Sequence, residues 1–531
     1  MDSIAGHKKF VFFLILVTFL LYFPSLFADF VFDDHYLILN NFHLRSAKGI
    51  WEGFTRDYYG QVNPQYSLGY YRPISLLTHW TDWQMWKTTA LGHHLTSLLI
   101  HIAVVVVLFF VILKLFQSTP LAFFAAAIFA VHPSHVNSVT FISGRVDAIA
   151  TFLSLSALLA FTARKAVSPI FYFLALLAKE ISVTTPILIF WKEREKSWRS
   201  AFLWMIPFAA VLVIVLVIRH FVLGSIRQLS LGFENIVSGL SLIPAYLRFM
   251  VLPPIQLYLE PPISILPIVF TILALVLYCV GLWFVRDNKI RSWSLMWLIT
   301  LLPVLGFVRI ETSLDERFLY FPSVSFCLLF AGCLTKYLQK RNHNEELPSK
   351  QIWITAALIL LIYSPVLLVR QMYWQNDVSL WSAAAETNPN DSRVLFRLGV
   401  AYLQADDFGQ AEENFVKALS APNQDKTITA ALYAHLATLK QAKNVSDDVE
   451  NLYHKALAIN PDYYTAHFNL GLFYKKSGQL KKAEQEFREA IRCNYSSPQA
   501  HQNLADVLRE MGKPEESEKH MRIAKELGTS S

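Results

Sequence analysis

Long apolar runs limit this chain more than any other feature of its sequence. Residues 10–28, 90–113 and 200–222 carry almost no charge, and a helix needs roughly 20 apolar residues to cross a hydrocarbon core about 30 Å thick. Over all 531 residues, 54% are hydrophobic and 16% are charged, which is too apolar for an ordinary soluble protein. The chain is therefore predicted to be all-α and to cross a membrane many times.

The same length rule predicts a bundle of about eleven transmembrane helices. Three of the segments are short, because helices that pair inside the protein need not span the full thickness. The predicted spans are 10–28, 90–113, 120–131, 139–163, 168–179, 181–191, 200–222, 263–285, 293–310, 318–338 and 351–369.

Lysine and arginine residues between the predicted spans gather on one side of the membrane. Cytoplasmic loops of membrane proteins carry the excess of basic residues, so the side with the lysines and arginines is predicted to be cytoplasmic. The loop after the first span and the whole C-terminal region are then predicted to face outward. The basic residues on the predicted cytoplasmic side are Lys8, Lys9, Lys114, Arg164, Lys165, the run 192–199, Arg286, Lys289, Arg291, Lys336, Lys340, Arg341 and Lys350.

The polar C-terminal region repeats itself. Segment 394–419 aligns with segment 466–491, and small and aromatic residues fall at equivalent positions. The equivalent leucines, separated by 38, 34 and 34 residues, are Leu398, Leu436, Leu470 and Leu504. This is the period of a tetratricopeptide repeat with one four-residue insertion. Such repeats stack into an α-solenoid with a concave surface that binds peptides or partner proteins, although a spacer or self-association module explains them equally well.

These patterns predict two domains. Residues 1–370 form the transmembrane domain, and residues 371–531 form an outward-facing tetratricopeptide-repeat domain. Within the second domain, 377–391 matches half of a repeat and 392–531 holds about four repeats. Only the short segment 370–376 is left to act as a hinge between the last span and the repeats.

Charge and cysteine content exclude several classes of protein. The net charge is +7, but the basic residues punctuate the apolar runs and form no basic face, and no Gly-rich phosphate loop is present. Neither nucleic acid nor nucleotide hydrolysis is supported. The four cysteines have no metal-ligand spacing. His132 and His135 lack a third ligand with supporting spacing, so no metal site is predicted and a divalent metal is unsupported.

Ionisable residues gather near the predicted outer boundaries of the spans. Such groups are costly at membrane depth and commonly line a polar cavity. An acidic pair, Asp33 and Asp34, follows the first span in the motif FDD (32–34). The other candidates lie in YRPI (71–74), HPSH (132–135), GRVD (144–147), AKE (178–180) and ERFLYFPS (316–323); they are Arg72, His132, His135, Arg145, Asp147, Lys179, Glu180, Glu316 and Arg317.

The order of these motifs, followed by tetratricopeptide repeats, resembles the transmembrane and tetratricopeptide-repeat O-mannosyltransferases and their bacterial relatives. The resemblance covers nearly the whole chain. It implies a membrane glycosyltransferase of the GT-C fold that moves a sugar, mannose in the best-known members, from a polyprenyl phosphate to a Ser or Thr hydroxyl with inversion. It also implies that the acidic pair sits at the active site. One departure is Asn137, at a position where family members commonly carry an acid.

The chemistry of such a transfer suits the candidate residues. A carboxylate must take the proton of the acceptor hydroxyl, and Asp33 is slightly favoured as this base with Asp34 orienting it. Cations must hold the departing phosphate, and Arg145, Lys179 and Arg317 are candidates. A structural ion pair within the membrane explains Arg145 and Asp147 equally well, and structural pairs with neighbouring residues explain Glu316 and Arg317 equally well. The two histidines shape a turn or bond the phosphate.

The predicted partners are a lipid-linked sugar donor, an acceptor protein bound in the repeat groove, and the membrane, and no cofactor is required. Two alternatives stay open, namely transfer to a lipid or glycan acceptor and an inactive membrane-anchored scaffold. A bacterial cytoplasmic membrane with extracytoplasmic repeats is favoured, because the repeat region is shorter than the arrays of eukaryotic relatives. In a eukaryote the same topology places the repeats in the lumen of the endoplasmic reticulum.

Overall fold

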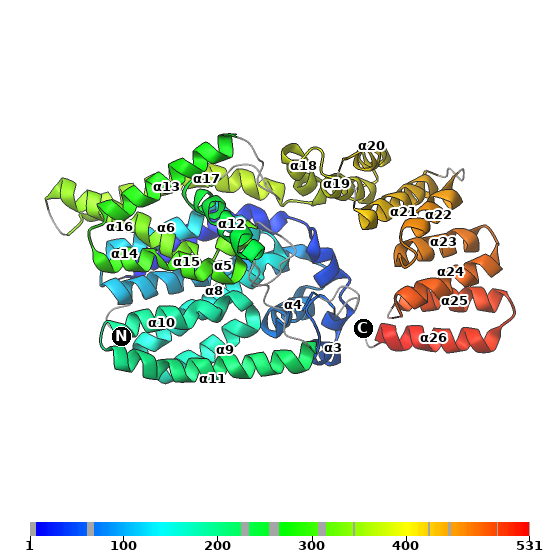
Figure 1. Ribbon diagram of the computed structural model, residues 1–531, viewed down its shortest axis with the longest axis horizontal. Coiled ribbons are helices and arrows are strands. Elements are labelled where there is room, and N and C mark those ends of the chain that lie inside the picture. The colour runs from blue at the N-terminus through cyan, green and yellow to red at the C-terminus, as the bar shows by residue number, and fades with distance from the viewer. Residues whose placement is uncertain are drawn as a thin grey trace. The chain divides into compact units, whose positions relative to one another are not determined.

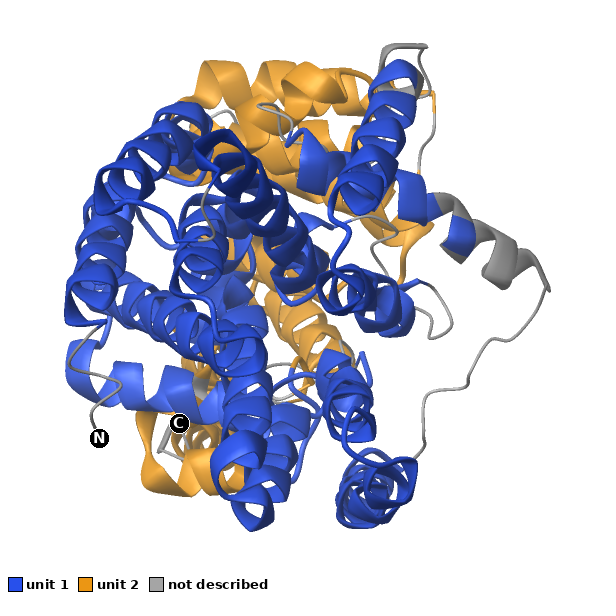
Figure 2. Ribbon diagram, turned by 90° about the vertical axis from the view of Figure 1, so that its left-hand side faces the viewer, with its two compact units in different colours: residues 1–38, 53–58, 68–375 blue, residues 39–52, 59–67, 376–531 orange. Residues whose placement is uncertain are grey.

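The computed structural model describes residues 7–60, 68–224, 233–253, 265–305, 315–343, 346–422, 425–443, 448–495 and 497–529. Every regular element within these ranges is helical. The prediction of an all-α protein is confirmed. Two compact units are formed, which Figure 2 shows in blue and orange: unit 1 holds residues 1–38, 53–58 and 68–375, and unit 2 holds residues 39–52, 59–67 and 376–531.

Unit 1 is a bundle in which helix α5 packs against α2, α4, α6 and α8, while α9 packs against α8 and α11 (Figure 1). Its α-helices are α2 (Lys8–Tyr22), α4 (Pro73–Trp86), α5 (Ala90–Phe116), α6 (Thr119–Val131), α7 (Val136–Val139), α8 (Arg145–Ala163), α9 (Ser168–Ala178), α10 (Thr185–Arg194), α11 (Trp198–Leu223), α12 (Phe233–Val251), α13 (Ile265–Phe284), α14 (Asn288–Ser294), α15 (Met296–Leu301), α16 (Ser323–Asn342) and α17 (Ser349–Tyr373).

Short 3-10 and π-helical turns connect these helices, and four of the candidate residues lie in them, namely His135, Glu180, Glu316 and Arg317. They are η1 (Phe23–Phe27), η2 (His35–Leu39), η5 (Pro133–His135), η6 (Ile142–Gly144), η7 (Lys165–Val167), η8 (Glu180–Thr184), η9 (Leu302–Val304) and η10 (Glu316–Leu319). Two further elements are η3 (Phe42–Arg45), in unit 2, and α3 (Ala47–Gly53), whose last residue belongs to unit 1.

Five helices of the described ranges are long and apolar enough to cross a membrane, or six if the bent pair Thr119–Val131 and Pro133–Val139 counts as one span. The count of about eleven is not confirmed. One reason is length: α9 has 11 residues and α10 has 10, which is roughly 16 Å of helix or less. Another is that segment 293–310 is split into α14, α15 and η9, and its last residues, 306–310, lie outside the described ranges.

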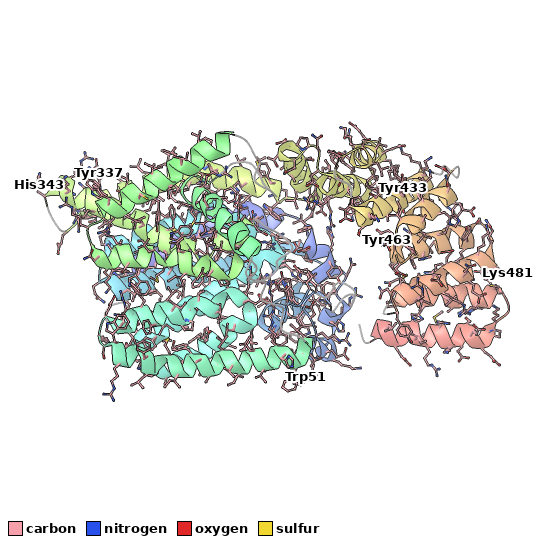
Figure 3. The ribbon with its side chains drawn as sticks, in the orientation of Figure 1. Trp51, Tyr337, His343, Tyr433, Tyr463 and Lys481 are labelled. Atoms are coloured by element: carbon pink, nitrogen blue, oxygen red, sulfur yellow. The ribbon has the colours of Figure 1, made fainter. Side chains whose placement is uncertain are left out.

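Unit 2 contains α18 (Asp377–Thr387) followed by four helix pairs. They are α19 (Ser392–Gln404) with α20 (Phe408–Leu419), α21 (Lys426–Ala442) with α22 (Val449–Ile459), α23 (Tyr464–Lys476) with α24 (Leu480–Cys493), and α25 (Pro498–Glu510) with α26 (Pro514–Thr529). Each helix packs against the next in the chain. Figure 3 labels Tyr463 and Lys481 on opposite edges of this stack.

The repeated residues explain why these pairs form. Gly399 lets α19 approach α20, because a methyl group added there would lie 2.5 Å from the ring of Phe415. Gly471 and Phe487 repeat the arrangement between α23 and α24. Aspartate or serine side chains cap four of the helices; Asp391, for example, accepts hydrogen bonds from the backbone amides of Arg393 and Val394 at the start of α19. Small residues and caps thus define the repeat.

Candidate active site

The two acids that follow the first span have different environments. The Asp34 carboxylate is fully buried and accepts hydrogen bonds from the Ser143 amide at 2.7 Å, the Ser143 hydroxyl at 2.5 Å and the Val31 amide at 3.3 Å. Burial raises the pKa of Asp34 from its ordinary value of 3.8 to about 7, although the bonds from Ser143 oppose this rise. Asp34 therefore ties the loop after α2 to the loop before α8.

Asp33 is only partly buried and lies between a strained residue and an unusual helix turn. Phe32 has a φ of 53°, which is uncommon for a residue with a side chain, and the π-helical turn η2 begins at His35. Such turns occur frequently at functional sites. The charge of Asp33 acts on Asp34 and on the hydroxyl of the buried Tyr58. Of the acidic pair, Asp33 is thus the carboxylate that a second molecule can reach.

Arg72 and Glu180 form a mostly buried ion pair beside this loop. The guanidinium of Arg72 donates to the Glu180 carboxylate at 2.9 Å and stacks over the Tyr70 ring at 4.2 Å. Arg219 of α11 binds the other oxygen of Glu180 at 3.3 Å and the Gly69 carbonyl at 2.7 Å. Burial alone raises the pKa of Glu180, but the two arginines outweigh it and lower the value to about 2. The trio keeps one net positive charge.

Two further ion pairs bring the AKE, GRVD and ERFLYFPS motifs together. Lys179 binds the Asp147 carboxylate at 2.5 Å, and Arg317 binds the Asp315 carboxylate at 2.5 Å. The two pairs lie near each other: the Lys179 ammonium is 5.0 Å from the ring centroid of Phe318, the residue after Arg317. The charges of Arg72 and Arg317 also act on Lys179. Arg72 also acts on Tyr58, as Asp33 does. Five sequence-predicted residues therefore surround one region, namely Asp33, Arg72, Asp147, Lys179 and Arg317.

The guanidinium of Arg145 is bound entirely by groups of the protein itself. It has no exposed surface and donates to the Asp82 carboxylate, to the His93 carbonyl at 2.9 Å and to the Ile142 carbonyl at 3.2 Å. A guanidinium held by three protein acceptors and closed off from solvent has no face left for a lipid phosphate. We therefore remove Arg145 from the phosphate-binding set and assign it to the framework that positions the GRVD loop.

Glu316 and the two histidines are framework residues as well. Glu316 pairs with Arg370 of α17 at 2.5 Å, and both side chains are buried. His132 contacts the Met250 carbonyl at 2.9 Å, and His135 contacts the Phe129 carbonyl and the Ser323 hydroxyl, each at 2.8 Å. Both rings are fully buried. Of the two roles left open for the histidines, these contacts favour the shaping of the turn over phosphate binding.

Sequence reasoning missed two residues of this region, Asp82 and Arg219. Asp82 is the buried partner of Arg145 and also accepts from the Thr96 hydroxyl at 2.7 Å. Arg219 stands inside α11, a candidate membrane span, where an unexplained charge is itself a signal of function. Within the described ranges, no group of three or more His, Cys, Asp or Glu side chains is arranged to hold a metal ion.

The fold and the site define an all-helical protein with several candidate membrane spans, a cluster of buried acids and cations, and a tetratricopeptide-repeat stack. Tetratricopeptide-repeat models match residues 392–425 and 452–485. Among solved structures, the crystal structure of MamA is 22% identical and covers 29% of this chain and 87% of its own, with a TM-score of 0.25.

Among curated proteins, the chain is similar to protein O-mannosyl-transferases. It is 27% identical to F38B6.6 of Caenorhabditis elegans over 76% of this chain and 62% of the relative. It is 24% identical to TMTC3 of Homo sapiens over 93% of this chain and 65% of the relative. The chain thus spans less than two thirds of the length of these relatives. The resemblance inferred from the motifs is confirmed by these names.

Proposed function

We propose that this chain is a membrane glycosyltransferase that moves a sugar, with mannose as the first candidate, from a polyprenyl phosphate to a Ser or Thr hydroxyl of an acceptor protein. The names of its relatives support the class of reaction. The observation that carries the proposal is the partly exposed Asp33 next to the buried Asp34, in a region that also holds the cations Arg72, Lys179 and Arg317.

In this mechanism Asp33 takes the proton from the acceptor hydroxyl as its oxygen attacks the anomeric carbon of the sugar. The bond between that carbon and the phosphate oxygen breaks, and a single displacement inverts the anomeric centre. The lipid phosphate carries one negative charge in the donor and gains a second as it leaves. Arg72, Lys179 and Arg317 stabilise this charge, because arginine and lysine bind phosphate oxygens strongly. Arg219 contributes through Glu180.

The ion pairs of these cations suit the task. Each cation is held by a carboxylate before the donor arrives, so it is positioned in advance and is not buried without compensation. Preorganised charges cost little reorganisation when charge develops in the transition state. In the proposed site the carboxylates of Glu180, Asp147 and Asp315 therefore orient the cations.

The remaining parts of the proposal concern topology and the acceptor. The first loop and the repeats face away from the cytoplasm, in accordance with the basic residues on the other side. The donor is lipid-linked, because nucleotide sugars are made in the cytoplasm. The tetratricopeptide stack of unit 2 binds the acceptor protein in its groove, as such solenoids bind peptides. A bacterial cytoplasmic membrane is favoured.

The experiment measures sugar transfer from radiolabelled polyprenyl-phosphate mannose in membranes that contain wild type, Asp33→Asn or Asp34→Asn. We expect Asp33→Asn to lower transfer roughly 10²–10⁴-fold while the protein stays monodisperse in detergent. Asp34→Asn should lower transfer less, since Asp34 orients the loop. Asp407→Asn is the matched control, because asparagine also caps a helix.

Three outcomes separate the alternatives. If the radiolabel appears in lipid or glycan and not in protein, the acceptor belongs to that class and the proposed transfer chemistry still holds. If Asp33→Asn is fully active, Asp33 does not act as the base and the proposed mechanism is wrong. If wild type transfers no lipid-linked sugar and retains no bound polyprenyl phosphate after purification, the inactive scaffold becomes the better explanation.

A further inference from the structure

The segment 370–375, which is the last turn of α17 and the two residues after it, buries three of its six side chains in unit 1. We call it the exit segment. The exposed fractions of Arg370 and Gln371 are 1% each, and that of Trp374 is 6%. Sequence reasoning treated this stretch as a hinge because it is short and separates two different regions. Its burial instead indicates that these residues are held in place within unit 1.

Hydrogen bonds fix the exit segment to the loops of the candidate active site. The Asp29 amide donates to the Gln375 carbonyl at 2.8 Å, four residues before Asp33. The side chain of Gln371 donates to the Leu21 carbonyl at 2.9 Å. The indole of Trp374 donates to the side-chain oxygen of Asn137 at 3.1 Å. The segment thus contacts both the first loop and the stretch that follows HPSH.

Trp374 also stacks on an aromatic ring that reaches the proposed catalytic groups. Its ring lies parallel to that of Phe141, with 5.0 Å between centroids and an angle of 24°. The Phe141 ring contacts the ring of Phe32 at 6.0 Å, and the guanidinium of Arg317 lies over Phe141 at 5.4 Å. Phe141 therefore contacts Trp374 and also two neighbours of the proposed reaction, Phe32 and Arg317.

The backbone of Phe32 has an unfavourable conformation that its neighbours must hold in place. Its φ of 53° is unfavourable for a residue with a Cβ, and such a conformation persists only where the surroundings enforce it. Asp33 is the next residue, so the direction of its carboxylate depends on how Phe32 is held. The ring of Phe32 is held by Phe141, and Phe141 is held by Trp374.

We infer that Trp374 is a positioning residue for the transfer reaction: through Phe141 it sets the orientation of Asp33 and of the Arg317 guanidinium. This inference rests on the proposed function. Asn137 takes part by fixing the indole, and this gives the unexpected asparagine at that position a purpose, since its side-chain oxygen accepts the indole N–H. Trp374 itself does not touch the reacting atoms.

The test compares Trp374, the C-cap of α17, with Trp353, which lies inside α17. Trp353 stacks on Phe10 with 5.5 Å between centroids and an angle of 20°, nearly the geometry of the pair Trp374 and Phe141. Its aromatic partners within the described residues lie on α2 and α6; they are Phe10, Phe13 and Phe123. We expect Trp374→Ala to lower the kcat of transfer by roughly 10²-fold, because small displacements of reacting groups are costly. Trp353→Ala should change kcat by less than about threefold at equal amounts of folded protein.

Two further measurements distinguish positioning from a purely structural role. Trp374→Phe retains the stacking and loses the hydrogen bond to Asn137, so it should recover most of the lost kcat. The pH profile of kcat should shift in Trp374→Ala, because the surroundings of Asp33 change, and it should stay unchanged in Trp353→Ala. The inference is overturned if the two alanine variants lose kcat in parallel with thermal stability and both keep the wild-type pH profile.

Binding of polyprenyl phosphate, measured as thermal stabilisation of the full chain in detergent, keeps this test separate from the proposed function. Trp374→Ala should weaken this binding, because loss of the indole displaces Phe141 and with it the Arg317 guanidinium. This measurement does not depend on turnover. If wild type transfers sugar and Trp374→Ala matches Trp353→Ala in kcat and binding, only the positioning role fails. If wild type neither transfers sugar nor binds the lipid phosphate, the proposed function and this inference fail together.

Discussion

Units 1 and 2 use ion pairs in opposite ways. In unit 1 the paired side chains of Arg145 and Asp82 are 0% and 3% exposed, whereas in unit 2 Arg488 is 43% exposed where it meets Glu484 and Glu516. Taking two charges out of water is costly, while pairs at a surface contribute little. The buried pair of Arg145 and Asp82 therefore fixes the framework of unit 1 and tolerates no loss of one partner, whereas the exposed pairs of Arg488 belong to a solvated surface.

The largest effect that this comparison predicts is the loss of Arg145. Arg145→Met leaves the Asp82 carboxylate buried without its cation, and removing one partner of a buried pair costs roughly 3–5 kcal/mol. We expect little monodisperse protein after detergent extraction. The double variant Arg145→Met with Asp82→Leu should recover much of the loss, because a buried pair can often be replaced by apolar residues.

If Arg145→Met alone extracts as well as wild type, the pair is not buried in the membrane-embedded protein, and the contrast between the two units would disappear.

The second prediction concerns pH. Because the pKa of Asp34 is raised from 3.8 to about 7 by burial, its contribution to stability is complete below about pH 4 and is lost as the pH rises through 7. The difference corresponds to roughly 4 kcal/mol at most. Thermal unfolding between pH 4 and 8 should therefore show wild type losing stability relative to Asp34→Asn.

Asp425 of unit 2 provides the control with the opposite sign. Hydrogen bonds from the backbone and side chain of Thr427 lower the pKa of Asp425, so its stabilisation is present above pH 4 and is lost as the pH falls. Asp425→Asn should differ from wild type only in its response to acid. Parallel pH curves for wild type and Asp34→Asn would mean that Asp34 is solvated.

The third prediction compares two glycines. A methyl group at Gly144 would lie 2.1 Å from the carbonyl oxygen of Asn137, whereas at Gly471 it would meet the ring of Phe487 at 2.8 Å. Backbone cannot move aside as a ring can, so Gly144→Ala should cost about 3 kcal/mol and Gly471→Ala roughly 1 kcal/mol. Thermal midpoints of the two variants, measured side by side, check the difference, and equal midpoints would contradict it.

The two units also differ in how far sequence reasoning reached. The repeats were recognisable because their determinants are local: Gly399 and Phe415 are sixteen positions apart in one helix pair and recur at Gly471 and Phe487. The motifs of unit 1 were found, but their pairings were not. Arg145 with Asp82 and Glu180 with Arg219 join segments that only the tertiary fold brings together. The predicted number of spans is not confirmed, and it has least support where short helices flank a 3-10 turn, as α9 and α10 do at η8.

The smallest predicted effect is that of Arg488→Ala in unit 2. Glu484 keeps its second partner, Lys513, at 2.8 Å, and the Arg488 side chain is already 43% exposed. The free energy of unfolding should therefore fall by no more than about 1 kcal/mol in this variant, and by less at high salt. Thermal unfolding of the full chain at low and high ionic strength measures this. A loss as large as that of Arg145→Met would show that the surface network of α24 and α26 holds the solenoid together, and exposure would then no longer separate the two kinds of ion pair.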